Sequence, residues 1–256
     1  MVELLIWPAL VGYGEAAVAY VGEARRPGLP GRLAIWGVRI GWLAQTGLLV
    51  VQAVETDGFP WSSWAGALNL LSWLVVGGYL FWGSRPRFRL LGLAVMPVAL
   101  ALLAAAYAGG GIAEDGDHPG LLLGIHVATM LAAFAGLTLA SGLSALYLWS
   151  ERRLKRRERT IFRLRMPPLE ALDGVVARTV LVSTGLLTLG IVLGVASLAV
   201  DGGGFDAAMA ATIAAWVAYA GFVVLRRRGL RGRRSARFVL TSFLLVVLVL
   251  SVTHFA

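Results

Sequence analysis

The amino-acid sequence predicts an all-α polytopic membrane protein, and three observations lead to that prediction. Hydrophobic residues make up 58% of the 256 residues and charged residues only 14%. The mean hydropathy is +0.77, whereas a soluble domain is about 45–50% apolar and about 25% charged. The charged residues also gather in clusters, and the apolar stretches between them are long enough to cross a bilayer. We therefore expect one integral membrane domain over residues 1–256.

Eight apolar stretches remain when the chain is divided at its charged clusters. A transmembrane helix needs about 20 such residues, and each stretch approaches or exceeds that length. The expected spans cover approximately residues 4–22, 33–54, 63–83, 90–109, 120–150, 175–200, 207–225 and 238–256.

The connections between these spans differ sharply in charge. All but two of the 23 Lys and Arg residues lie in four alternate connections, within residues 23–32, 85–89, 151–165 and 226–237. Cytoplasmic loops are rich in Lys and Arg, so these connections should face the cytoplasm of a bacterial-type cell. The opposite side is acidic and carries Glu3, Glu55, Asp57, Glu114, Asp115, Asp117, Asp201 and Asp206. An even number of spans then puts both termini on the outer, non-cytoplasmic side.

The first two spans each contain a charged residue. The first span has no basic segment before it and no small-residue cleavage site, which favours a retained helix over a signal peptide. Glu15 and Arg39 lie about seven residues from the cytoplasmic ends of their spans. Since an unpaired charge at that depth is costly, we expect a structural ion pair, with a proton or substrate path as the alternative.

The third span follows an outer segment that contains Trp61 and Trp64 within FPWSSW. Such residues usually form an interfacial aromatic belt, and they also suit the walls of a ligand pocket. In the fourth span, Met96-Pro97 predicts a kink.

The fifth span carries histidine near its outer end, in HPGLLLGIHVATM. His126 is about six residues into the helix, which is about 9 Å below its start. The span exceeds the bilayer thickness, so we expect it to tilt or to protrude. His118 should be a solvated loop residue, and Met130, one turn below His126, should serve packing more than metal ligation.

The last three spans bring a second outer histidine. GLLTLGIVLG at 185–194 places small residues at spacings that suit close helix packing. His254 ends the last span, and protrusion of the fifth span would bring His126 to its level. Two imidazoles on different helices at a common depth are what a six-coordinate haem iron requires. His126 and His254 are therefore candidate axial ligands of a non-covalent b-type haem, although a lone histidine usually bonds water or backbone.

Several other functions are disfavoured by composition. The chain has no cysteine, which excludes disulfides, thiolate chemistry and covalent haem attachment through its own thiols. Beyond haem iron we predict no metal. No catalytic constellation is visible, which disfavours an enzyme and leaves the question open. The net charge of +9 reflects topology and attraction to anionic lipid, and we expect no nucleic-acid partner.

Several of these motifs also resemble a known family. The segment 118–148, with its IHV around His126, resembles the helix of the cytochrome c assembly superfamily (CcsA, ResC, CcmC) that carries an outer haem-ligating histidine. Three further segments resemble parts of that family. Its outer loop resembles FPWSSW, its next helix resembles the segment from Leu172 with LTLGI, and its last basic loop resembles GLRGRRSARF. His254 falls near its second outer histidine. The resemblance covers roughly residues 35–256 and implies haem handling in cytochrome c biogenesis.

The sequence departs from the haem-handling members in one outer loop. Their tryptophan-rich segment is replaced here by DGGGFD at 201–206, which resembles the short HemX-like branch. The outer side also lacks the cations that haem propionates prefer. The alternative is therefore a haem-independent scaffold or regulator of tetrapyrrole biosynthesis that docks a cytoplasmic partner on its basic loops. Either reading implies partners from the cytochrome c assembly or tetrapyrrole pathways, and we favour haem handling.

Overall fold

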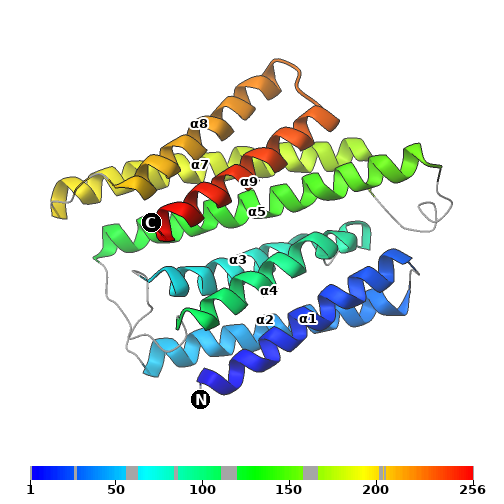
Figure 1. The fold of residues 1–256 in the computed structure, drawn as a ribbon, viewed down its shortest axis with the longest axis horizontal. Coiled ribbons are helices and arrows are strands. Elements are labelled where there is room, and N and C mark those ends of the chain that lie inside the picture. Colours follow the sequence, from blue (N-terminus) through cyan, green and yellow to red (C-terminus); the bar gives the residue numbers. More distant parts are fainter. Residues whose placement is uncertain are drawn as a thin grey trace. The chain divides into compact units, whose positions relative to one another are not determined.

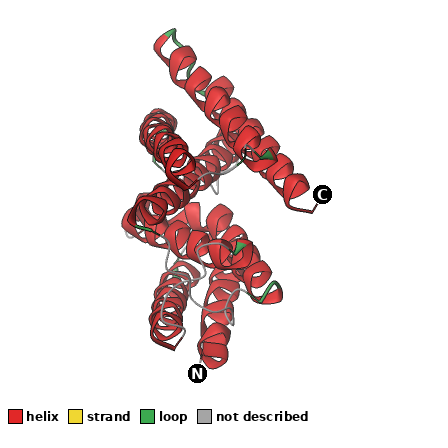
Figure 2. Cartoon of the chain, turned by 90° about the vertical axis from the view of Figure 1, so that its left-hand side faces the viewer, coloured by secondary structure: helices red, strands yellow, loops and turns green. Residues whose placement is uncertain are grey.

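The computed structural model describes residues 2–25, 28–55, 63–83, 86–110, 120–157, 167–201, 204 and 206–255. These residues are almost entirely helical and contain no strand (Figure 2). Seven of the helices in these ranges are long and apolar enough to cross a membrane. The all-α class and the multi-pass membrane character are thus confirmed, while the eighth span and the outer position of both termini stay predictions.

The chain divides into two compact units, and each is described by itself. The N-terminal unit holds residues 1–119 and 153–167, and the C-terminal unit holds residues 120–152 and 168–256. The helices of the N-terminal unit are α1 (Val2–Arg25), α2 (Leu29–Glu55), α3 (Trp64–Gly83), the short 3-10 helix η1 (Pro86–Leu91) and α4 (Gly92–Ala108) (Figure 1). The helices of the C-terminal unit are α5 (Leu121–Lys155), except for its last three residues, α7 (Leu169–Asp201), α8 (Ala207–Arg227) and α9 (Arg233–Phe255).

Some helices extend beyond the predicted spans. The fifth span was expected over 120–150 and the sixth over 175–200, but α5 continues to Lys155 and α7 begins at Leu169. A span needs about 20 residues for the hydrocarbon core, and nothing in that requirement ends the helix at the membrane surface. The helix therefore continues into the polar, charged segments that follow or precede the apolar stretch. In α4 the helix also runs through Pro97.

The N-terminal unit is held together by a close approach of α1 and α2. A Cβ atom at Gly12 would lie 2.8 Å from the Gly37 carbonyl oxygen, and one at Gly41 would lie 2.8 Å from the Tyr13 ring. Small residues at such positions let two membrane helices pack backbone to backbone. The exposed residues of these helices include large apolar side chains such as Val18 and Leu43, as expected of helices that face lipid.

A chain of polar side chains crosses this unit from α1 to α3. The Tyr13 hydroxyl donates a 2.6 Å hydrogen bond to Gln45 Oε1, and Gln45 Nε2 donates to the backbone oxygen of Asn69 at 3.0 Å and to its Oδ1 at 2.9 Å. All three side chains are buried. Because lipid offers no hydrogen-bond partners, polar groups at this depth bond to one another across helices.

In the C-terminal unit, polar and aromatic contacts fix α8 between its neighbours. Trp216 Nε1 donates to Thr188 Oγ1 of α7 at 2.8 Å, and the rings of Phe222 and Phe238 join α8 to α9 with centroids 5.8 Å apart. Near the start of α7, Asp173 accepts a 3.1 Å hydrogen bond from the Gly232 amide and pairs with Arg226 at 2.7 Å. Gly232 has a φ of 63°, a conformation that favours glycine.

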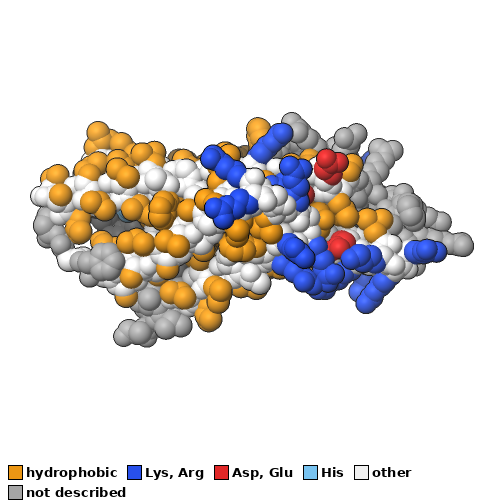
Figure 3. Space-filling model, turned by 90° about the horizontal axis from the view of Figure 1, so that it is seen from above, with side chains coloured by type: hydrophobic (Ala, Val, Ile, Leu, Met, Phe, Trp, Pro, Cys, Tyr) orange, Lys and Arg blue, Asp and Glu red, His pale blue; other side chains and the backbone are white. Residues whose placement is uncertain are grey.

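Charge is distributed unevenly along the molecule. On the face drawn in Figure 3, Lys and Arg side chains gather in one half and hydrophobic side chains cover the other. The α8–α9 turn contributes exposed arginines to the basic end, namely Arg227, Arg228, Arg231, Arg233, Arg234 and Arg237. This asymmetry is typical of a membrane protein whose basic end faces the cytoplasm.

Candidate functional site

The candidate site is built around His126, in the second turn of α5. Its half-buried ring packs against α7, and Nδ1 lies 2.7 Å from the Gly190 carbonyl oxygen. A carbonyl oxygen only accepts hydrogen bonds, so Nδ1 must carry the proton in this contact. In the neutral imidazole, Nε2 then keeps its lone pair. This is the nitrogen that can bind a metal, and histidine ligands almost always donate their other ring N–H in this manner.

Two glycines one turn apart on α7 make room for the side chains of α5. A Cβ atom at Gly194 would lie 2.7 Å from His126 Cε1 and 3.0 Å from its Nδ1. One at Gly190 would lie 2.5 Å from Met130 Sδ. Real Cβ contacts are essentially never closer than 3.0 Å. The ring of His126 thus occupies a notch that any larger residue at 194 would fill.

Met130 follows His126 on the same face of α5 and packs into the second notch. Its sulfur contacts Gly190 while His126 contacts Gly194, one turn further along α7. Side chains at i and i+4 lie side by side on one helix face. Axial ligands of haem iron must approach from opposite faces of the macrocycle, so His126 and Met130 are not suited to ligate one iron together.

The other predicted pocket residues are placed as follows. His254 lies in the last turn of α9, at the same end of the C-terminal unit as the start of α5 (Figure 1), and its side chain is outside the described part of the structure. His118 and Trp61 also fall outside the described residues. Trp64 begins α3 in the N-terminal unit, where the residue is 41% exposed and its ring contacts Gly109 at the end of α4.

The predicted pair of Glu15 and Arg39 takes a different arrangement. Both side chains are exposed, and the Arg39 guanidinium lies over the Trp36 ring at 5.3 Å from its centroid. Among the ion pairs of the described residues, the carboxylate on α1 that meets an arginine is Glu23, which lies 3.8 Å from Arg89. A cation–π contact within one helix therefore serves Arg39 in place of the expected carboxylate.

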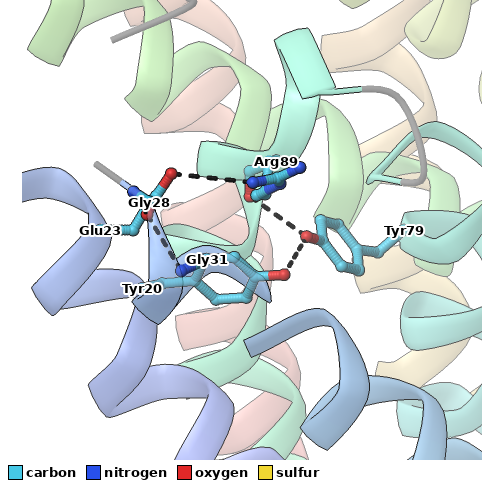
Figure 4. Close-up of polar contacts among 6 residues, drawn as sticks. All are labelled: Tyr20, Glu23, Gly28, Gly31, Tyr79 and Arg89. Carbon is cyan, nitrogen blue, oxygen red and sulfur yellow. Dashed lines mark hydrogen bonds and ion pairs between the residues drawn. The ribbon is translucent and has the colours of Figure 1, made fainter. Parts of the chain in front are cut away.

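Glu23 is the acidic residue that sequence reasoning missed. Its carboxylate accepts hydrogen bonds from the amides of Gly28 at 2.8 Å and Gly31 at 3.0 Å, at the start of α2 (Figure 4). Helix N-termini carry free amides and a partial positive charge, both of which favour a carboxylate. Its position just ahead of the glycine- and proline-rich turn was the available signal.

The same cluster joins a second turn. Tyr79 donates to the backbone oxygen of Arg89 at 3.1 Å, and its hydroxyl lies 2.5 Å from that of Tyr20 (Figure 4). The cluster thus links the α1–α2 turn with η1. Its contacts satisfy backbone groups and stabilise the fold, so we assign it a structural role.

Gly190 and Gly194 are the site residues that sequence reasoning did not assign to His126. Their spacing in GIVLG equals the spacing of His126 and Met130 in HVATM. Two antiparallel helices can place residues with the same four-residue spacing opposite one another. This shared spacing was the signal that could have paired the two glycines with His126 and Met130. Among the described residues, no group of three His, Asp or Glu side chains is arranged to hold a metal ion.

Together these features define a multi-pass helical membrane protein with one histidine held in a fixed orientation near the end of a helix. Residues 61–255 match the family described as Cytochrome C assembly protein. The chain therefore belongs to the cytochrome c assembly protein family.

Three relatives illustrate the similarity. The chain is 30% identical over 132 residues to the cytochrome c biogenesis protein CcsA of Gloeobacter violaceus, covering 48% of this chain and 38% of CcsA. It is 28% identical over 171 residues to protein HemX of Brevibacillus brevis, covering 64% and 61%. It is 29% identical over 137 residues to an uncharacterized 28.8 kDa protein of Azospirillum brasilense, covering 52% and 51%.

The chain thus spans about half the length of the curated relatives that it matches. No solved structure matches it.

Proposed function

We propose that this protein handles haem in cytochrome c biogenesis, with His126 as one axial ligand and His254 as the other, on the outer side of a bacterial-type cytoplasmic membrane. The observation that carries the proposal is the 2.7 Å contact between His126 Nδ1 and the Gly190 carbonyl. In the neutral imidazole this contact leaves Nε2 unprotonated and available to a metal. Membership of the cytochrome c assembly family supplies the biological setting.

His126 and its surroundings suit an axial ligand of haem iron in three respects. His126 lies near the start of α5 and is half-buried, so it is reachable without being solvated on all sides. Its notch at Gly194 fixes the ring. The neighbouring exposed side chains on α5, Ile125 and Leu123, are apolar, as the surroundings of a macrocycle should be.

Haem is the cargo in this proposal. C-type cytochromes attach haem covalently at Cys-x-x-Cys-His, and this chain has no cysteine of its own with which to retain it covalently. A non-covalent hold through imidazoles suits a protein that binds haem and then releases it. What the residues of this chain do is bind the iron, orient the ring and keep its edge in an apolar environment.

The test is an absorption spectrum of the full chain purified in detergent, as isolated and after haem titration. We expect a low-spin Soret band with resolved α and β bands in the wild type. His126→Ala and His254→Ala should each lose the low-spin pattern, and added imidazole should restore it. His118→Ala is the matched control, and its spectrum should be that of the wild type.

A wild type without a saturable haem signal would overturn the proposal. A low-spin spectrum that survives His254→Ala would remove His254 as the second ligand. The alternative function, a haem-independent scaffold or regulator of tetrapyrrole biosynthesis, is favoured by the exposed arginines at the α8–α9 turn. It predicts a cytoplasmic partner that is lost when Arg228, Arg231 and Arg234 are changed to Gln.

A further inference from the structure

We infer that α7 is the positioning helix for His126: the Gly190 carbonyl sets the imidazole tautomer and the missing side chain at Gly194 sets the ring orientation. The inference rests on the proposed function, because it assigns these two glycines a role in presenting Nε2 to a metal. Neither residue touches the ligand in this scheme. Both act through His126.

The first support is the register of α5 against α7. His126 meets Gly194, Met130 meets Gly190, and a Cβ at Gly136 would collide with Ser183 Oγ. The contacted residue of α7 moves toward its N-terminus as the residue of α5 moves toward the C-terminus. The two helices are therefore antiparallel, and these contacts extend over about three turns. His126 therefore belongs to a series of contacts between α5 and α7 and is not an isolated surface side chain.

The second support is the hydrogen bond itself. A carbonyl oxygen has two lone pairs, so Gly190 can accept from the imidazole as well as within its own helix. At 2.7 Å the contact is as short as N–H···O bonds in proteins become. Fixing Nδ1 as the donor excludes the other neutral tautomer, in which Nε2 would carry the proton and could not bind iron.

The third support is the space at Gly194. An added Cβ would be 2.7 Å from His126 Cε1, about 0.7 Å short of the 3.4 Å at which ordinary contact begins. A displacement of that size directed away from Gly190 would lengthen the distance from Nδ1 to the carbonyl oxygen to about 3.4 Å, outside the range of about 2.7–3.2 Å that is usual for N–H···O hydrogen bonds. The absence of a side chain at Gly194 thus allows the hydrogen bond between His126 Nδ1 and the Gly190 carbonyl oxygen.

The helix offers a matched control. Gly185 lies nine residues before Gly194 in α7, and a Cβ there would meet nothing within 4 Å. Gly185→Ala and Gly194→Ala make the same chemical change in the same helix and gain the same helix propensity. Their difference isolates the contact with His126.

The experiment uses the full chain, free of haem, labelled with 15N-histidine and studied by NMR in detergent micelles. The 15N chemical shifts distinguish a protonated from an unprotonated ring nitrogen, and His126→Gln assigns the signal. We expect His126 to be protonated at Nδ1 in the wild type and in Gly185→Ala. In Gly194→Ala we expect a mixture of tautomers. Haem affinity should fall about 10- to 100-fold in Gly194→Ala, the usual cost of removing a partner that orients a histidine ligand, and should not change in Gly185→Ala.

The outcomes separate this inference from the proposed function. A wild-type His126 protonated at Nε2 would overturn the inference even if haem bound to the protein, and this measurement does not depend on the folding of either glycine variant. Gly194→Ala with wild-type tautomer and affinity would overturn it as well. Protonation at Nδ1 in a protein that binds no haem would overturn the proposed function and leave the positioning by α7 intact.

Discussion

The Asp173 carboxylate should contribute more stability than any other charged group at the basic end of the C-terminal unit. It is 8% exposed, accepts the Gly232 amide at 3.1 Å and pairs with Arg226 at 2.7 Å. A hydrogen bond to a charged group contributes about 1.5–3 kcal/mol net. Asp173→Ala loses both contacts and leaves Arg226 unpaired, so we expect a loss of about 3–4 kcal/mol in the free energy of unfolding.

A double-mutant cycle apportions this loss. We expect a coupling of about 1.5–3 kcal/mol between Asp173→Ala and Arg226→Ala, measured by reversible unfolding of the purified protein in mixed micelles. The pair of Glu151 and Arg233 is the internal control, because it is longer, 3.7 Å, and its arginine side chain is 46% exposed. Its coupling should be about 0–1 kcal/mol. Equal couplings for the two pairs would refute the argument that burial and geometry set the difference.

Three further predictions follow from the N-terminal unit and the topology. Glu23→Gln should lower the free energy of unfolding by about 1–3 kcal/mol, measured in the same way, because the helix-capping charge and the pair with Arg89 are lost; no change would contradict the role of the cap. Gly41→Ala should destabilise by about 1–3 kcal/mol through overpacking against the adjacent helix, whereas Gly47→Ala, in the same helix with ordinary contacts, should be neutral or stabilising in thermal unfolding. Because the chain has no cysteine, a single introduced cysteine reports on which side of the membrane its position lies. In intact cells a membrane-impermeant thiol reagent should label Gly110→Cys, and it should label Arg228→Cys only after permeabilisation. The reverse labelling pattern would contradict the predicted orientation.

The positions of the helices along the membrane could be predicted because they depend on local quantities. Bilayer thickness sets the length of an apolar stretch, and charge clusters mark its ends. Seven of the described helices meet that description. The predicted fifth and sixth spans were shorter than the helices, which reach Lys155 and begin at Leu169. The same rule says nothing about how far a helix continues into water.

The direction in which each side chain points could not be predicted in the same way. Glu15 and Arg39 match in depth, since depth follows from the rise per residue. Their orientation around the helix axis depends on which face packs, and in lipid the outer face of a helix is as apolar as its inner face. The packed faces carry Gly12, Gly37 and Gly41, which leaves the two charged residues outside the interface.

In the candidate site, too, one part could be predicted from the sequence and another could not. His126 was identifiable from its residue type and its place near the end of a span. Its partner is a backbone carbonyl, and every residue has one, so no sequence pattern marks it. Only the spacing of the two glycines on α7 carried information about where the histidine would fit.

The carboxylate of Glu23 has a consequence for how the protein is made. Its bonds to Gly28 and Gly31 need only the first two helices, whereas its contact with Arg89 needs residues that are synthesised about 60 positions later. At about 5–20 residues per second, several seconds separate the two events. The first helical hairpin can thus close its own turn soon after it enters the membrane and hold a negative charge ready for the arginine that follows. In this part of the chain, the order in which the contacts become available is the order of translation.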